Sequence, residues 1–267
     1  GARILLNANA SPFHEGKNSQ RETMLMQRAR ETKSAIVYVN QVGAQDELVF
    51  DGSSVVVSAN GDIVTRLKSF EADFAIVDIA SDGSVALGDI VAFESDLDRV
   101  YEALVLGTRD YVRKNGFTDV VIGLSGGIDS SIVAAIAVDA LGADHVHGVA
   151  MPSRYSSQGS LDDAEKLAKA LGIDHRIMSI EPAFTAYLDM LAPSFAGKEP
   201  DLTEENLQSR CRGMSLMALS NKFGWMVLTT GNKSEMAVGY FTIYGDSVGG
   251  YAVIKDVFKT QVFALCR

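Results

Sequence analysis

The sequence has few cysteines and histidines and no long apolar run. Of its 267 residues, two are cysteine and four are histidine. Cys211 and Cys266 lack the spacing of a zinc site and are too few for a disulfide framework, which fits a reducing cytoplasm. The histidines share no spacing typical of a metal site or a catalytic triad. No stretch approaches the roughly 18 uninterrupted apolar residues of a transmembrane helix, so no membrane span is predicted.

Basic residues are also scarce. The chain has 24 Lys and Arg against 34 Asp and Glu, a formal net charge of −10, which argues against nonspecific binding to nucleic acid or to an anionic membrane. With 47% hydrophobic residues, the length suits one large or two medium domains. The first residues already resemble a strand and the last end inside a predicted helix, so we expect the chain to be a piece of a longer polypeptide.

A glycine turn between a strand and a helix is the most informative stretch. The apolar run 120–124 predicts a buried strand, Ser125-Gly126-Gly127 breaks it, and an alanine-rich helix follows over about 130–141. Adjacent glycines let the backbone approach a ligand, and the new helix contributes unpaired N–H groups and a positive dipole end. The stretch predicts a phosphate-binding site.

Asp129 specifies the kind of site, because a carboxylate beside bound phosphate would repel it. A divalent cation between them removes the conflict, and Mg²⁺ binds through one or two carboxylates plus substrate phosphates. The lysine-bearing P-loop and the Gly-x-Gly-x-x-Gly fingerprint are both absent. We therefore predict a magnesium–nucleotide site; the structural alternative is a tight turn in which Asp129 only favours the helix dipole.

Strands and helices alternate from residue 99 onward. We expect helices over 99–115, 130–141, 160–171 and 203–223, and strands over 120–124, 145–151, 173–180 and 225–228. This alternation predicts an α/β fold: a parallel Rossmann-like sheet with helices on both faces, similar to adenine-nucleotide hydrolases. Ligands of such sheets lie at the carboxyl ends of the strands.

The first part of the chain has a mixed α/β pattern. We expect strands over 3–9, 35–40, 48–50, 55–58 and 63–67, with a hairpin at Asn60-Gly61 and a helix that a capping box at Ser19–Glu22 starts. An acidic stretch from 68 to about 98 reads as a solvated connection in which 74–79 could add an edge strand. We divide the chain into a first domain (1–80), a linker (81–98) and a second domain (99–267).

Motifs in the first domain resemble the nitrilase-type glutaminase domain of glutamine-dependent NAD synthetases. They are Asn9–Phe13, Gly16-Lys17, Tyr38–Asn40 and Gln45–Gly52. The resemblance implies part of a nitrilase-like α/β sandwich whose catalytic Glu, Lys and Cys lie upstream of Gly1, so we identify no catalytic residue in the chain. It also implies glutamine binding by Ser11 and Lys17. Without it, Ser11 would only cap a turn and Lys17 would be a solvated lysine.

Motifs in the second domain resemble the synthetase domain of the same family. The glycine turn is similar to the Ser-Gly-Gly-x-Asp-Ser loop of ATP pyrophosphatases, and the other matches are 151–157, 205–210, 229–235, 239–242, 244–246 and 255–262. The resemblance implies magnesium binding by Asp129 and Glu235 and deamido-NAD binding by Asn206 and Glu235. It implies ATP binding by Gly123, Leu124, Ser125, Gly126, Gly127, Ile128, Asp129, Ser130, Thr230 and Lys259. Without it, Asn206 could be an ordinary first-turn residue and Lys259 an exposed lysine.

The resemblance implies a ligase that amidates deamido-NAD to NAD. ATP is the co-substrate, an acyl-adenylate the intermediate, and glutamine or free ammonia the nitrogen source; relatives pair their synthetase domains, so we expect at least a dimer. One alternative is another pyrophosphate-releasing amidotransferase, such as a GMP or asparagine synthetase. A second alternative is a noncatalytic nucleotide-binding regulator, against which the pair Asp129 and Glu235 argues.

Overall fold

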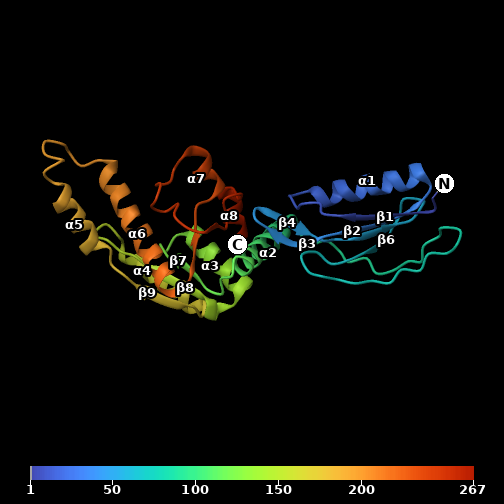
Figure 1. Ribbon diagram of the computed structural model, residues 1–267, viewed down its shortest axis with the longest axis horizontal. Coiled ribbons are helices and arrows are strands. Elements are labelled where there is room, and N and C mark those ends of the chain that lie inside the picture. The colour runs from blue at the N-terminus through green and yellow to red at the C-terminus, as the bar shows by residue number, and fades with distance from the viewer. Residues whose placement is uncertain (1) are drawn as a thin grey trace. The chain divides into compact units, whose positions relative to one another are not determined.

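The computed structural model describes residues 2–267, and the chain forms two compact units (Figure 1). Unit 1 extends to Asp110 and unit 2 covers Tyr111–Arg267. Helix α2 (Asp96–Lys114) contains the boundary. Among the described residues, no helix is long and apolar enough to cross a membrane.

Unit 1 contains a four-stranded sheet in the order β1-β2-β5-β6. Its strands are β1 (Ile4–Asn9), β2 (Ala35–Asn40), β5 (Val55–Val57) and β6 (Ile63–Arg66). β1 and β2 are parallel, and the other neighbours are antiparallel. The predicted hairpin between β5 and β6 is confirmed: Gly61 has φ +82° and donates its N–H to the Ser58 carbonyl at 2.8 Å.

Helix α1 (Lys17–Thr32) covers one face of this sheet. Its Leu25 and Ala29 pack with Ile36 and Val57 in a buried cluster. The predicted capping box at Ser19 is wrong, because the helix begins two residues earlier. Gly16 precedes it in the left-handed conformation at φ +75°, and the Ser19 hydroxyl donates to the Gly16 carbonyl at 3.0 Å. A glycine provides this entry because it adopts positive φ without steric cost.

A separate hairpin and the first part of α2 complete unit 1. The hairpin consists of β3 (Val42–Gln45), which the sequence did not predict, and β4 (Leu48–Asp51). Ala103 and Leu106 of α2 form a second buried cluster with Phe70. The possible edge strand over 74–79 is absent from the described structure, where only Ile79 makes an isolated bridge. Phe74 is 82% exposed, so this segment lacks the burial that would stabilise a strand.

Unit 2 is built on a five-stranded sheet in which all neighbours are parallel, as predicted. The order is β11 (Tyr251–Ala252), β10 (Met226–Thr229), β7 (Val120–Gly123), β8 (Val146–Ala150) and β9 (Asp174–Ile177). The chain runs outward from β7 to β9 on one side, and β10 then returns to the other side of β7. The boundary between β7 and β10 is thus the topological switch point, beside which open α/β sheets bind their ligands.

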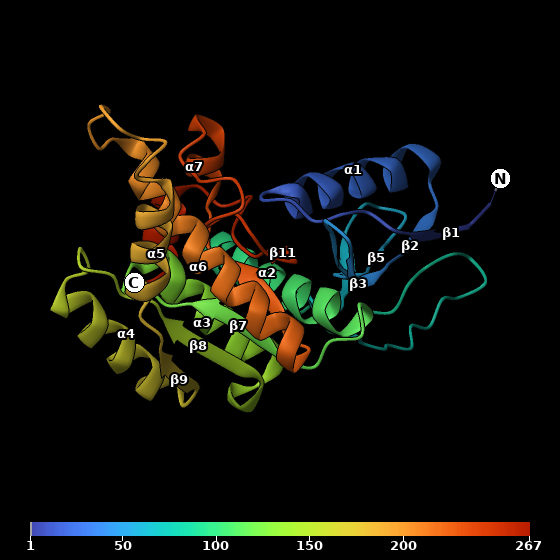
Figure 2. The same cartoon turned by 60° about the vertical axis from the view of Figure 1, so that its left-hand side comes forward.

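Helices cover both faces of this sheet, as predicted (Figure 2). Val121 belongs to a core cluster with Phe184 of α5 (Glu181–Leu191) and Leu216 of α6 (Leu202–Phe223). Side chains alternate along a strand, so the fully buried Val120 and Ile122 point to the opposite face. Helices α3 (Ile128–Leu141) and α4 (Gln158–Leu171) lie there. The remaining elements are η1 (Ala143–His145), α7 (Lys233–Val238) and α8 (Lys259–Leu265).

Helices α4, α5 and α7 of unit 2 differ from prediction, and the short α7 was not predicted. α4 begins at Gln158 rather than Ser160, because Ser157 is its N-cap and accepts the Ser160 N–H at 3.1 Å. α5 was not predicted at all. Its Pro182 lies in the first turn, where proline suits a helix.

Candidate nucleotide-binding site

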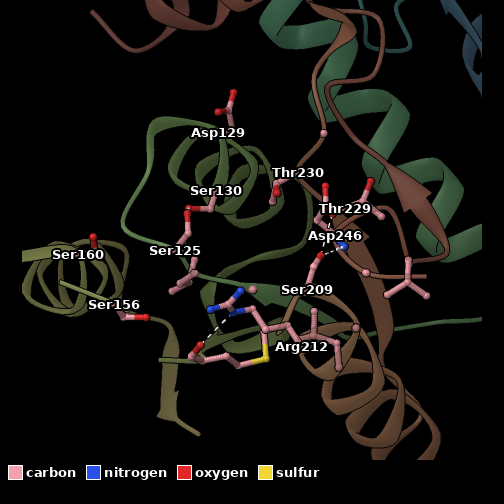
Figure 3. A pocket seen from close by; sticks show the side chains of 18 of the residues that line it. Ser125, Asp129, Ser130, Ser156, Ser160, Ser209, Arg212, Thr229, Thr230 and Asp246 are labelled. Atoms are coloured by element: carbon pink, nitrogen blue, oxygen red, sulfur yellow. Dashed lines mark hydrogen bonds between the residues drawn. The ribbon is translucent and has the colours of Figure 1, made fainter. Parts of the chain in front are cut away.

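A cavity of about 610 Å³ lies in unit 2 at the carboxyl ends of β7, β8 and β10. The segments that follow these strands form much of its wall, and α6 contributes a further side (Figure 3). Several of the predicted site residues line it: Gly123, Leu124, Ser125, Asp129, Ser130, Thr230 and Glu235. The structure thus places the two motifs that flank the switch point around one cavity.

The glycine loop between β7 and α3 is held in a conformation that only glycine tolerates at its centre. Gly126 has φ +76°, and a Cβ built there would lie 2.3 Å from the Ser160 carbonyl oxygen. The loop is further braced by hydroxyls: Ser125 Oγ lies 3.1 Å from Ser130 Oγ, and Gly127 N–H donates to Ser125 Oγ at 3.1 Å. The loop is therefore packed directly against the start of α4.

The first turn of α3 is available to an anion. Gly127 occupies the N-cap position and provides no side-chain acceptor, so the first N–H groups of the helix keep their donor capacity and the positive end of the dipole faces the loop. A phosphate oxygen is the ligand that such an end attracts. Ser125 and Ser130 add two hydroxyls at the same edge of the cavity.

Asp129, in the first turn of α3, carries a negative charge into this anion-binding surface. Its Oδ1 accepts a hydrogen bond from Asn232 Nδ2 at 3.2 Å, and its Oδ2 forms an ion pair with Lys259 Nζ. The Asp129 side chain is 19% exposed. The lysine demonstrates that a cation is accommodated against this carboxylate.

Glu235 brings a second carboxylate to the cavity from α7. Asn232 caps this helix: its Oδ1 accepts the Glu235 N–H, and its own backbone N–H donates to Glu235 Oε2, both at 3.0 Å. This capping box fixes the first turn of α7 just after β10. Asp129 and Glu235 therefore share Asn232 as a hydrogen-bond partner.

The carboxylates of Asp129 and Glu235 can hold a magnesium ion only when a phosphate supplies further ligands. Within residues 2–267 there is no group of three or more histidine, cysteine, aspartate or glutamate side chains that could hold a metal. Two carboxylates beside a phosphate-binding loop match the habit of Mg²⁺, which takes one or two carboxylates, waters and substrate phosphates. Asp129 and Glu235 thus have the chemistry to serve as two carboxylate ligands of a magnesium ion whose other ligands come from a phosphate and water.

Arg212 of α6 is a lining residue that sequence reasoning missed as a site residue. Its Nε donates to the Met151 carbonyl at 3.1 Å, which aims the guanidinium across the floor of the cavity (Figure 3). Burial lowers the pKa of Arg212, yet arginine remains charged in proteins. It therefore places a fixed positive charge opposite the glycine loop. Ser209, Gly213 and Leu216 line the same wall at helical spacing, a signal that the sequence did contain.

A serine-rich wall at the start of α4 was also missed. Ser156, Ser157 and Ser160 line the cavity beside Tyr155; the first two belong to the matched segment 151–157, to which no ligand was assigned, and Ser160 follows it. Ser157 and Ser160 hydroxyls lie 2.9 Å apart. These side chains provide donors and acceptors on the side of the cavity opposite Thr229 and Thr230 (Figure 3).

The remaining predicted residues occupy different surroundings. Gly126, Gly127 and Ile128 belong to the loop and the α3 start but are not among the lining residues. Lys259 does not line the cavity; its ammonium pairs with Asp129 and its backbone N–H donates to the Ser234 hydroxyl of α7 at 3.0 Å. Asn206 lies on α6, where its Oδ1 accepts the Thr242 hydroxyl at 2.8 Å, so the structure joins it to the loop that follows α7.

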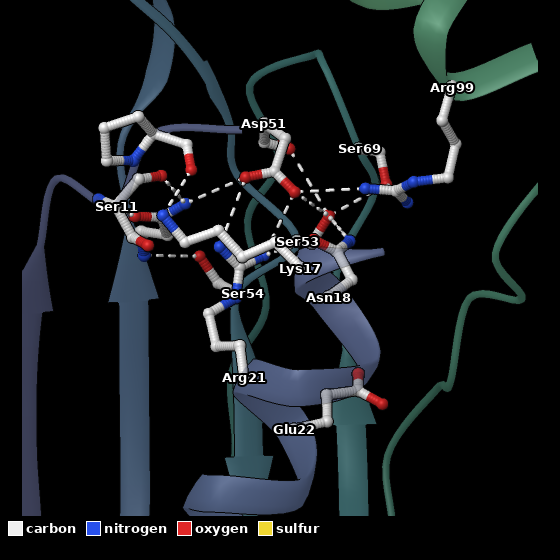
Figure 4. A network of polar contacts seen from close by, with 12 residues as sticks. Ser11, Lys17, Asn18, Arg21, Glu22, Asp51, Ser53, Ser54, Ser69 and Arg99 are labelled. Carbon is white, nitrogen blue, oxygen red and sulfur yellow. Dashed lines mark hydrogen bonds and ion pairs between the residues drawn. The ribbon is translucent and has the colours of Figure 1, made fainter. Parts of the chain in front are cut away.

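Ser11 and Lys17 lie in unit 1, beside a buried ionic network (Figure 4). Ser11 N–H donates to Asn40 Oδ1 at 2.8 Å, and Lys17 Nζ donates to the Pro12 carbonyl at 2.6 Å. Asn40 Nδ2 in turn donates to the fully buried Asp51 at 3.2 Å. Asn40 thus holds the Ser11 backbone, and the Lys17 ammonium reaches the neighbouring Pro12 carbonyl from the first residue of α1.

The parallel sheet, with a glycine loop and two carboxylates at its switch point, defines a doubly wound α/β domain, a class that binds its ligands beside that point. The family model described as NAD synthase matches residues 100–267, and the model described as carbon-nitrogen hydrolase matches residues 1–87. The chain belongs to the NAD synthase family, and the resemblance inferred from its motifs is confirmed.

Individual relatives agree with this assignment. The chain is 52% identical over 270 residues to the glutamine-dependent NAD(+) synthetase of Rhodobacter capsulatus, covering 100% of this chain and 49% of that protein. A solved structure of the Acinetobacter baumannii glutamine-dependent NAD+ synthetase, in complex with ADP, matches at 47% identity and a TM-score of 0.95, covering 98% of this chain and 50% of that one. An NH3-dependent NAD synthetase from Campylobacter jejuni matches 65% of this chain and 73% of its own at 30% identity and a TM-score of 0.59. The chain thus spans about half the length of the curated relatives it matches.

Proposed function

We propose that this chain carries the synthetase half of a glutamine-dependent NAD synthetase. It would convert deamido-NAD to NAD with ATP: the nicotinate carboxylate attacks the α-phosphorus, pyrophosphate leaves, and ammonia displaces AMP from the acyl-adenylate with release of a proton. The observation that carries this proposal is the glycine loop after β7 combined with Asp129 and Glu235 at one cavity, in a chain whose residues 100–267 match the NAD synthase model.

The chemistry of the cavity suits this reaction because a carboxylate is already a nucleophile. The step needs orientation and charge neutralisation more than a general base. The α3 N-terminus, Ser125, Ser130 and Thr230 would bind the phosphates and orient the α-phosphate. Asp129 and Glu235 would hold Mg²⁺, which neutralises phosphate charge when bound. Lys259 would exchange its contact with Asp129 for a phosphate oxygen of ATP.

We assign Asn206 and Glu235 to deamido-NAD. Asn206 is tied to Thr242, and Thr242 N–H donates to Asp246 Oδ1 at 2.8 Å. Asp246 itself lines the cavity. This chain of contacts supports a substrate-binding wall formed by α6 and the loop after α7, next to the proposed ATP site.

Isotope exchange tests the proposal. In the full-length protein, exchange of labelled pyrophosphate into ATP should require deamido-NAD, because no pyrophosphate leaves until the carboxylate attacks. Asp129→Asn should abolish the exchange, and Asn221→Ser, an exposed position on α6, should leave it unchanged.

The same assay separates the two alternatives. Exchange supported equally by xanthylate would identify another pyrophosphate-releasing amidotransferase instead. ATP binding without any exchange, whatever carboxylate substrate is supplied, would identify a noncatalytic nucleotide-binding regulator.

We further propose that unit 1 is part of a glutaminase domain in which Ser11 and Lys17 contact glutamine. The carbon-nitrogen hydrolase match over residues 1–87 supports this. The catalytic Glu, Lys and Cys would precede Gly1, so glutamine should support turnover only in a polypeptide that includes the upstream segment. Glutaminase activity of the 267-residue chain alone would contradict the proposal.

We also propose that the synthetase unit pairs with a second copy in the cytoplasm. Val238, Tyr240 and Tyr244 of unit 2 are each at least 77% exposed, and clustered exposed apolar side chains favour association. The free cysteines Cys211 and Cys266 suit a reducing compartment. Sedimentation of the full-length protein as a monomer at micromolar concentration would contradict the pairing.

A further inference from the structure

Asn232 connects the two carboxylates that the proposed function assigns to magnesium. It is fully buried at the N-cap of α7, directly after β10. Its Nδ2 donates to Asp129 Oδ1 at 3.2 Å, and its backbone N–H donates to Glu235 Oε2 at 3.0 Å. One residue therefore hydrogen-bonds a carboxylate from each side of the switch point.

The orientation of the Asn232 carboxamide follows from its partners. The Glu235 N–H lies 3.0 Å from Oδ1 and can only donate, so the amide oxygen must face it. The NH2 group then faces Asp129, whose ionised carboxylate can only accept. Both ends of the carboxamide are therefore hydrogen-bonded. In the flipped orientation the NH2 group would face the Glu235 N–H and the amide oxygen would face the Asp129 carboxylate, so both hydrogen bonds would be lost.

Asparagine performs two tasks here that other N-cap residues cannot combine. Serine, threonine and aspartate also cap helices well, and each would satisfy the Glu235 N–H. Serine and threonine are too short to reach Asp129 as well, and an aspartate would put a like charge against it. The choice of asparagine is therefore explained by its hydrogen bond to Asp129 together with the helix cap, and not by the cap alone.

We propose that Asn232 is a positioning residue for the magnesium site. This inference rests on the proposed function. The Asn232 carboxamide holds Asp129 Oδ1 by a neutral hydrogen bond and so adds no positive charge that would repel a metal ion. Asp129 Oδ2 remains the oxygen that faces a cation, here the Lys259 ammonium. Through the capping box the same residue fixes the Glu235 side chain. Partners of this kind, which hold a ligand without touching the metal, typically change metal affinity by about 10- to 100-fold.

The experiment compares Asn232→Ser and Asn232→Thr, which keep an N-cap acceptor, with Asn221→Ser. Asn221 lies exposed on α6, where its Nδ2 donates to the Met217 carbonyl at 2.8 Å, so this control also removes one asparagine donor. Calorimetric titration of the full-length protein would give the affinity for ATP with Mg²⁺ and with EDTA. We expect the gain in affinity that Mg²⁺ provides to fall about 10- to 100-fold in both variants, with ATP affinity in EDTA unchanged.

A merely structural role gives a different result. It would lower the ATP affinity equally with Mg²⁺ and with EDTA, and that outcome overturns the inference, as does loss of the folded state in both variants. If the variants fold and Mg²⁺ raises their ATP affinity as much as in the natural protein, this inference alone is overturned and the proposed function stays intact. If Mg²⁺ does not raise the ATP affinity of the natural protein, the assignment of Asp129 and Glu235 to magnesium is itself overturned.

Discussion

The two units each contain an aspartate beside basic and amide side chains, but only one of these carboxylates is saturated. Asp51 of unit 1 is fully buried and accepts hydrogen bonds from Arg21, Arg99, Asn40 and Ser53. Asp129 of unit 2 is 19% exposed and accepts two. A carboxylate offers about four lone-pair sites. Asp51 therefore has no capacity for a ligand, whereas Asp129 keeps some.

The basic partners differ in the same way. Arg99 lies over the rings of Phe13, Phe70 and Phe93 at 5.7, 5.5 and 4.8 Å, in addition to its ion pair with Asp51 (Figure 4). Lys259 is 35% exposed and holds Asp129 with one flexible ammonium. The buried network around Asp51 stabilises one arrangement of its side chains, whereas the half-exposed Lys259 can move away from Asp129 into solvent. Partner saturation, more than charge, therefore distinguishes the structural Asp51 from Asp129, the carboxylate proposed to hold magnesium.

Asp51→Ala should give the largest stability effect. It leaves Arg21 and Arg99, both 5% exposed, without their carboxylate, and removing one partner of a buried ion pair costs about 3–5 kcal/mol. Urea unfolding followed by circular dichroism measures the loss. Trp225, the chain's one tryptophan, lies in unit 2. Its fluorescence follows the unfolding of that unit, whose midpoint Asp51→Ala should shift less than the transition seen by circular dichroism.

Two controls define the contrast. Asp62→Ala removes an exposed carboxylate of unit 1 and should change stability by no more than about 0.5 kcal/mol. Asp129→Ala should change the Trp225 transition by about 1–3 kcal/mol, the cost of leaving the buried Asn232 NH2 group without its acceptor, because the half-exposed Lys259 can return to water. If Asp129→Ala proved more destabilising than Asp51→Ala, the distinction between the two acids would be wrong.

Gly126→Ala tests the rigidity of the loop beside Asp129. Alanine at φ +76° is strained, and its Cβ would collide with the Ser160 carbonyl at 2.3 Å. We expect a loss of about 1–3 kcal/mol in the Trp225 transition, together with weaker ATP binding. Gly231→Ala is the matched control, since a Cβ at this cavity position meets nothing within 4 Å. Equal losses in both variants would show that the loop conformation is not the cause.

The sequence predicted the parts of this picture that are local. The run Val120–Leu124, followed by Ser125-Gly126-Gly127 and a helix, predicts the strand–loop–helix unit within a dozen residues, and the alternating elements after it predict the parallel sheet. The predicted strand over 173–180 is too long, because β9 ends at Ile177, and helix α5, which begins at Glu181, was missed. Pro182 lies in the first turn of α5, where proline is favoured, and so marks the start of this helix.

Contacts between distant segments could not be predicted in this way. Arg212 reaches the cavity because α6 packs beside β7, about 90 residues after the loop it faces, and no local pattern encodes that packing. The same holds for Asp51, whose partners come from α1, β2 and α2. Asn232 was visible within a motif, but its contact with Asp129 depends on β10 and β7 being neighbours.

The smallest effect concerns a third carboxylate, at the amino end of β7. Asp119 accepts hydrogen bonds from Thr118, His145 and His147. Burial acts to raise the pKa of Asp119, but these hydrogen bonds outweigh it and lower the pKa below the ordinary value of 3.8. Because the folded pKa is the lower one, the stabilisation is complete above pH 3.8 and is lost as the pH falls from there through the folded value.

Asp119→Asn should therefore lose less stability than the natural protein between about pH 5 and pH 3, by less than about 1 kcal/mol. Urea unfolding followed by Trp225 fluorescence at several pH values measures the difference. Asp163→Asn, an exposed position on α4, is the control and should keep the natural pH dependence. If Asp119→Asn kept it as well, the hydrogen bonds from Thr118, His145 and His147 to Asp119 would not be the cause of the acid-dependent loss of stability.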